Sequence, residues 1–113
     1  MASSDDVYDD GVLRVARQGT VLVIVGEIDE SNYAGLVGAL GRLAGGPGEI
    51  NVNLAGVAFC DLAGLRAIIR LSEAGADGAA PGGRRLVLHE APRQVRRVLQ
   101  IMGWDGMPGV IIA

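Results

Sequence analysis

Hydrophobic residues in this chain form short aliphatic runs that alternate with segments of helical period. The runs that predict strands are Val12–Ala16, Val21–Val25, Ile50–Leu54, Leu86–Leu88 and Val110–Ile112. Gln18 and Gly19 predict a tight turn between the first two strands. Because Val21–Val25 is apolar at every position, we expect it to be a central strand that is covered on both faces.

Three segments have the spacing of amphipathic helices. The first is expected to be capped by Ser31 and to run to about Ala44, with a buried stripe of Tyr33, Leu36, Leu40 and Leu43. The second begins at Asp61, and its buried face contains Leu65, Ile68, Ile69 and Ser72. The third has apolar residues at i, i+3, i+4 and i+7, which are Val95, Val98, Leu99 and Met102. Gly103 follows this helix in a capping position.

The alternation of strands and helices predicts the fold class. It indicates an α/β layered fold with a mixed, mostly parallel sheet of four to five strands and packed helices. Right-handed crossovers between the parallel strands are expected. At 113 residues the chain is long enough for one core. We therefore expect a flexible acidic tail at residues 1–11 and a single domain at residues 12–113.

Composition limits the compartment and the partners. The net charge is −3, all ten basic residues are arginine, and no basic cluster alternates with aromatic residues, so nucleic acid is not an expected partner. Cys60 is the only cysteine, which favours a reducing compartment. The acidic N-terminus is unlike a secretory signal, and Val21–Val25 is far too short to span a membrane. These features predict a cytoplasmic protein without direct membrane insertion.

The residues that carry chemistry are few. His89 is the only histidine and lacks the neighbouring ligands that a metal site needs. Cys60 has no histidine or basic neighbour in the sequence, which is typical of a buried small residue. No phosphate-binding loop, nucleophile elbow or zinc-ligand spacing is present. The sequence therefore predicts no enzyme activity, no catalytic residue, no metal and no cofactor.

Three blocks of sequence carry a family resemblance: Gly26–Asp29, Asn53–Leu65, and Leu86 through Pro92 to Trp104. In this order they resemble the STAS domain, the module of sulfate transporters and of bacterial anti-sigma factor antagonists. The resemblance covers roughly residues 12–112. It implies a signalling module that binds a protein, namely a kinase-fold anti-sigma factor or a related regulator. A homodimer is left open.

The resemblance also implies a site at the start of the second helix. Antagonists have the pattern Asp-Ser-Ser/Thr-Gly there, and the partner kinase phosphorylates the first Ser, which breaks the complex. Asp61 matches the Asp, Leu62 the phosphoacceptor, Ala63 the second hydroxyl position and Gly64 the Gly. Asp29 matches the acidic residue that ends the second strand. Since Leu62 has no hydroxyl, we expect no phosphorylation at this position.

Each of these residues has a structural and a functional interpretation. Asp61 is either a helix cap alone or, with Asp29, part of an acidic rim for a partner or a metal–nucleotide. Gly64 is expected to allow close packing of the helix on the sheet. Leu62 either packs beneath the loop at residues 75–83 or lies on the partner surface, where it anchors or blocks a partner. Arg66 belongs either to a solvated edge or to a contact with an acidic partner.

Three functional hypotheses follow from the sequence. The first is a non-catalytic module that resembles an anti-sigma factor antagonist and binds its partner through Asp29, Asp61, Leu62, Ala63, Gly64 and Arg66. The alternative is an accessory or scaffold subunit of a transporter-associated or stressosome-like complex. A third is a small-ligand binder that uses a groove between Asp29 and Asp61, which requires Mg²⁺ or the helix N-terminus for a phosphate group.

Overall fold

The computed structural model describes residues 7–44, 48–72 and 85–113. Within these ranges the strands are β1 (Val7–Asp9), β2 (Leu13–Gln18), β3 (Val21–Ile28), β4 (Ile50–Cys60), β5 (Leu86–His89) and β6 (Val110–Ile112). The α-helices are α1 (Tyr33–Leu43), α2 (Leu62–Ile69) and α3 (Arg93–Ile101), and short 3₁₀ turns follow α2 and α3. The start of the expected tail and the loop at residues 75–83 lie outside the described residues.

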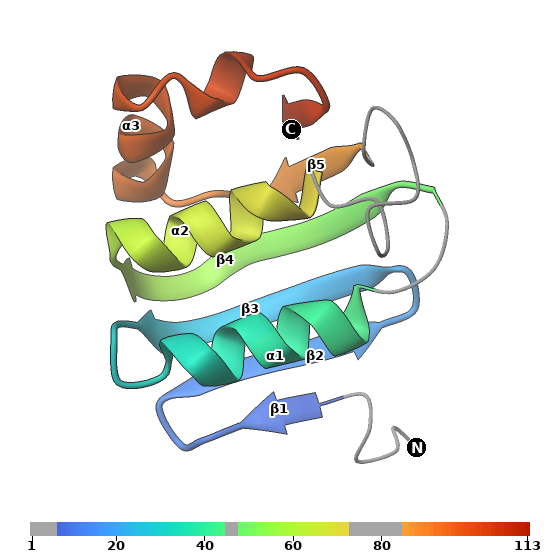
Figure 1. The fold of residues 1–113 in the computed structure, drawn as a ribbon, viewed down its shortest axis with the longest axis vertical. Coiled ribbons are helices and arrows are strands. Elements are labelled where there is room, and N and C mark those ends of the chain that lie inside the picture. Colours follow the sequence, from blue (N-terminus) through green and yellow to red (C-terminus); the bar gives the residue numbers. More distant parts are fainter. Residues whose placement is uncertain (1–6, 45–47, 73–84) are drawn as a thin grey trace.

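The six strands form one sheet whose spatial order is the same as the chain order, β1 to β6 (Figure 1). The first three strands are antiparallel, and β3 to β6 are parallel. This confirms the predicted mixed α/β fold, with more strands than the four to five expected. The additional strand is β1, in which Val7 pairs with Ala16 of β2. These residues belong to the tail expected from the acidic N-terminal sequence, and a three-residue strand carries too little periodicity to be predicted.

The core lies between the sheet and the helices. Each helix connects two neighbouring parallel strands, and right-handed crossovers of this kind return to the same face of the sheet. In Figure 1, α1 and α2 lie in front of the strands. The largest fully buried side chains come from both layers and include Leu13, Ile24, Ile28, Leu36, Leu54, Leu65, Ile68, Leu88 and Leu99. Aliphatic side chains therefore supply nearly all of the core.

The apolar strand β3 is not covered on both faces, so that prediction was wrong. Leu22 and Ile24 are buried against the helices, whereas Val21 and Val23 are half-buried and Val25 is 43% exposed. Side chains alternate between the two faces of a strand, and the helices occupy one face. Valine is favoured on the other face for its β-branched backbone preference, which the hydrophobic pattern alone does not distinguish from burial.

The start of α1 also differs from the prediction. Asn32, not Ser31, is the N-cap residue, and its side chain makes no capping hydrogen bond to the helix. Its amide instead donates to the Glu27 carbonyl at 2.9 Å and accepts from the Asp29 N–H at 3.0 Å. These bonds hold the turn between β3 and α1. The predicted stripe is confirmed, with three buried leucines (Leu36, Leu40 and Leu43) and a half-buried Tyr33.

Strand β4 is longer than predicted and reaches Cys60. Its pairing with β3 shifts register twice, between Val23 and Val25 and between Gly26 and Glu27. Gly56 lies in this irregular part, where a Cβ atom would be 2.9 Å from a methyl carbon of Val25. The irregularities allow β4 to continue beside β3 to its end. As a result, Asp61 follows the strand directly and is the N-cap residue of α2.

Candidate functional site

Asp61 is the N-cap of α2, as predicted. Its backbone is extended, with φ −78° and ψ 170°, and its carboxylate accepts a hydrogen bond from the Gly64 N–H at 2.8 Å. The Asp61 N–H donates to the Ile28 carbonyl at 3.1 Å, which ties the helix start to β3. The carboxylate thus satisfies an N–H that the helix leaves without a partner.

Gly64 allows α2 to lie directly on the sheet. It is buried, and a Cβ atom built on it would collide with Cγ2 of Ile28 and lie 3.1 Å from the Asp61 carboxylate. The glycine is therefore needed for packing, in agreement with the sequence interpretation. The neighbouring Ala63 is exposed.

Leu62, the first residue of α2, is 45% exposed. This exposure is not that of a core residue, and the loop that was proposed to cover it lies outside the described residues. An aliphatic side chain at this position adds little to the core, since about half of its surface remains in water. Leu62 therefore stands on the surface beside the capped Asp61.

Asp29 lies at the same edge of the sheet as Asp61. The two residues follow Ile28 and Cys60, which pair in the parallel strands β3 and β4. The carboxylate of Asp29 accepts hydrogen bonds from the hydroxyl and the backbone N–H of Ser31, and these bonds lower its pKa from the ordinary value. Both aspartates thus use their carboxylates to hold local backbone. This arrangement gives little support to the hypothesis of a small-ligand groove between them.

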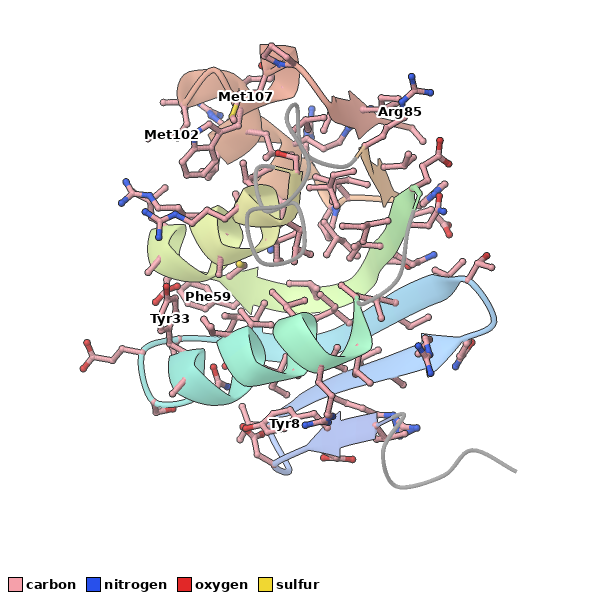
Figure 2. The ribbon with its side chains drawn as sticks, turned by 45° about the vertical axis from the view of Figure 1, so that its right-hand side comes forward. Tyr8, Tyr33, Phe59, Arg85, Met102 and Met107 are labelled. Carbon is pink, nitrogen blue, oxygen red and sulfur yellow. The ribbon has the colours of Figure 1, made fainter. Side chains whose placement is uncertain are left out.

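Two exposed apolar residues at this edge were missed by the sequence analysis. The Val12 carbonyl accepts from the Glu27 N–H at 3.2 Å, and Glu27 pairs with Phe59. Val12 and Phe59 are both exposed, and Figure 2 shows Phe59 at the end of β4, beside the start of α2. The available signal was an aromatic residue only two positions before the capping aspartate. We define the edge surface as the exposed Val12 and Phe59 at this end of the sheet together with Leu62, three residues after Phe59 in the chain.

An apolar recess of about 270 Å³ adjoins this surface, between the end of β4 and the helices α2 and α3. It is lined by Phe59, Cys60, Leu65, Gln94, Val95 and Val98. Burial, and secondarily the Asp61 charge, raise the pKa of the Cys60 thiol to about 12. Cys60 is therefore a protonated, unreactive thiol near neutral pH, as expected for a buried small residue.

The remaining candidate residues have simple environments. Arg66 is exposed on α2, and no ion pair of Arg66 is present among the described residues. His89 shares a hydrogen bond of 2.9 Å with the Asn51 side-chain oxygen. In the described ranges, no three His, Cys, Asp or Glu side chains are grouped as metal ligands, and no helix is long and apolar enough to cross a bilayer.

Comparisons with known proteins agree with this architecture. The family model described as "Mlab, STAS domain" matches residues 12–112. Among solved structures, the fold is similar to that of an anti-sigma factor antagonist from Mycobacterium paratuberculosis, with a TM-score of 0.62 and 22% identity over 97% of this chain and 89% of that chain. No curated protein matches the sequence. At 22% identity, the solved structure shows that the fold is shared. The family model spans nearly the whole chain, so the chain belongs to the Mlab, STAS domain family.

Proposed function

We propose that this chain is a non-catalytic signalling module that binds an anti-sigma factor or a serine-kinase-type regulator through the start of α2. The observation that carries the proposal is the exposure of Leu62 at the first position of a helix that is capped and rigidly packed. When a partner covers this exposed leucine, apolar surface is removed from water and the complex is stabilised. For a side chain that is half exposed, this contribution is roughly 1 kcal/mol.

The neighbouring residues support a protein partner. Phe59, three residues before Leu62, and Val12 are further exposed apolar residues at this end of the sheet. The site proposed from the sequence adds Asp29, Asp61, Ala63, Gly64 and Arg66 to Leu62. Small apolar surfaces with a polar rim are typical of transient protein interfaces. The recess beside Phe59 has room for one side chain of a partner.

The missing hydroxyl defines the proposed regulation. A phosphoserine at position 62 would add nearly two negative charges beside Asp61 and repel a docked partner. Leucine cannot be phosphorylated, so the interaction through this surface is independent of phosphate at the helix start. We infer that complex formation is instead controlled by the amounts of the chain and of its partner.

The test is the affinity of purified anti-sigma factor kinases from the source organism for wild type and two variants. Leu62→Glu places a charge on the surface and is expected to weaken binding at least tenfold, about 1.4 kcal/mol. Val37→Glu is the matched control, since Val37 of α1 is 44% exposed and lines a groove with Ala67 and Arg70 at the C-terminal end of α2, not with its start. Equal affinities of wild type and Leu62→Glu in calorimetry, with both proteins folded, would refute the proposed surface.

The second candidate is an accessory or scaffold subunit of a transporter-associated or stressosome-like complex. It is supported by membership of the STAS domain family, because the sequence resemblance relates this domain to sulfate transporters as well as to antagonists. In that case phosphorylation at position 62 has no role. The two candidates differ in the partner that co-purifies with the tagged chain, which is a soluble regulator in the first case and a membrane-associated or multi-subunit assembly in the second.

A further inference from the structure

Helix α3 exposes a strongly basic surface. Arg93, Arg97 and Ile101 are spaced one helical turn apart and form one ridge, and Arg96 and Gln100 form the next. All five side chains are exposed, while the opposite side of the helix buries Val95 and Leu99 in the core. We define the α3 arginine face as Arg93, Arg96, Arg97, Gln100 and Ile101.

The charges on this face are unfavourable for the isolated chain. The helix has no acidic residue in its first turn, and its three arginines lie in the N-terminal half, where the helix dipole disfavours positive charge. Arg93 is three and four residues from Arg96 and Arg97, so these cations also repel each other. Across the described ranges, none of the three forms an ion pair, in contrast to Arg85, which pairs with Glu49 at 3.8 Å.

The helix is held firmly in place. Gln94 donates from its side chain to the Ala58 carbonyl at 3.0 Å, which links the start of α3 to the end of β4. Val95 and Leu99 are anchored in the core. The arginines are therefore presented on a fixed backbone, and a partner that binds them has little backbone to order.

We propose that the α3 arginine face docks an acidic segment of another protein. Carboxylates one helical turn apart would match the Arg93–Arg97 and Arg96–Gln100 spacings, and an aliphatic side chain would cover Ile101, which is 72% exposed. This surface belongs to a different helix from the start of α2, so it goes beyond the proposed function. It provides a second contact for the same or another partner.

Two other polyanionic partners fit the face less well. A nucleic acid is disfavoured because the chain has a net charge of −3 and the face carries no aromatic side chain for base stacking. A membrane surface is disfavoured because the apolar side of α3 is used in the core, and Ile101 alone does not form an inserting stripe. An acidic protein segment needs neither feature.

The experiment measures binding of a labelled synthetic peptide of about five helical turns, with glutamates at i, i+4 spacing and leucines between them. Its counterpart has glutamine in place of glutamate. The test variant is Arg93→Glu/Arg97→Glu, which should fold because acidic residues are favourable at a helix N-terminus. The control variant, Arg14→Glu/Arg42→Glu, changes the net charge equally on β2 and α1.

The expected result is salt-sensitive binding of the glutamate peptide that is at least tenfold weaker in the α3 variant and unchanged in the control. Amide resonances of residues 93–101 should shift in the wild-type complex, and Leu62→Glu should bind the peptide normally. The proposal is overturned if the glutamine peptide binds equally or if the control variant loses as much affinity. It is also overturned if phosphatidylglycerol vesicles or duplex DNA bind this face more tightly than the peptide, or if the peptide does not bind.

Discussion

Gly64 of α2 lies against Ile28 of β3 so closely that a Cβ atom at position 64 would collide with the Ile28 side chain. This contact sets the distance between the helix and the sheet at the point where the candidate site begins. Because Asp61 caps the same turn of helix, the backbone at Leu62 is held from both sides. The exposure of Leu62 is thus a consequence of well-packed neighbours and not of a loose helix end.

Replacing Gly64 with alanine should destabilise the protein. The added methyl group must displace Ile28, and overpacking of this kind costs about 1–3 kcal/mol, which exceeds the gain in helix propensity of about 1 kcal/mol. Urea unfolding measures the difference. Gly38→Ala in α1 is the control, because nothing lies within 4 Å of its added Cβ atom, and this variant should be more stable than wild type. A Gly64→Ala protein as stable as Gly38→Ala would contradict the packing role.

Two substitutions at Asp61 separate its capping role from its charge. Asp61→Asn keeps an oxygen for the Gly64 N–H and should change stability by only a few tenths of a kcal/mol, whereas Asp61→Ala should lose about 1 kcal/mol. Chemical denaturation of both variants checks this order. If the asparagine variant is folded like wild type but has lost partner binding, the negative charge belongs to the interface. If both variants are equally unstable, the capping interpretation fails.

Cys60 should make stability fall at alkaline pH. Its pKa is raised from the ordinary value of 9.0 to about 12, so the folded protein keeps a thiol proton that the unfolded chain releases. The stabilising contribution is therefore complete below pH 9 and is lost as the pH rises from 9 towards 12. Unfolding free energies measured at pH 8 to 10.5 should decline more steeply for wild type than for Cys60→Ala. Parallel curves would show that the thiol does not remain protonated.

Glu90 has a positive φ of 53°, the one such non-glycine residue in the described part of the chain. Its carboxylate accepts a hydrogen bond from the Asn53 amide at 2.8 Å, which both Glu90→Gly and Glu90→Ala remove. Glycine adopts this backbone conformation without the steric penalty, so Glu90→Gly should be more stable than Glu90→Ala by about 1 kcal/mol. The same pair of substitutions at Glu30, whose φ is not positive, should show the opposite order in thermal unfolding. If the alanine variant is the more stable one at both sites, backbone strain at Glu90 is excluded.

Local features of the site were predictable from the sequence. The Asp61 cap and the tight packing of Gly64 depend on residues within one turn of helix and on the strand before it, and such short-range patterns are visible in the sequence. Five of the strands and the helix stripes were predicted for the same reason, except that Met102, expected on the buried side of α3, is the C-cap residue and is 38% exposed. The assignment of the cap of α1 to Ser31 failed because two adjacent polar residues compete: the Ser31 hydroxyl donates to the Asp29 carboxylate, and the Asn32 amide donates to the Glu27 carbonyl.

Features that depend on strand register were not predictable. Phe59 belongs to the edge surface because β4 passes two register shifts against β3, and nothing in the sequence specifies those shifts. The partial exposure of Val21 and Val23 and the exposure of Val25 depend on which face of the sheet the helices cover, which is a property of the assembled sheet. Strand β1 forms only because β2 offers an edge to Val7–Asp9.

The order of the strands has a consequence for synthesis. Each strand pairs with the one translated immediately before it, so no strand has to be inserted between two that are already joined. A doubly wound sheet, in which the strand order reverses partway, requires such long-range steps. During translation from the N-terminus, every newly completed strand–helix unit therefore meets a template edge that is already in place. The sheet can grow in one direction, with β6 as its last addition.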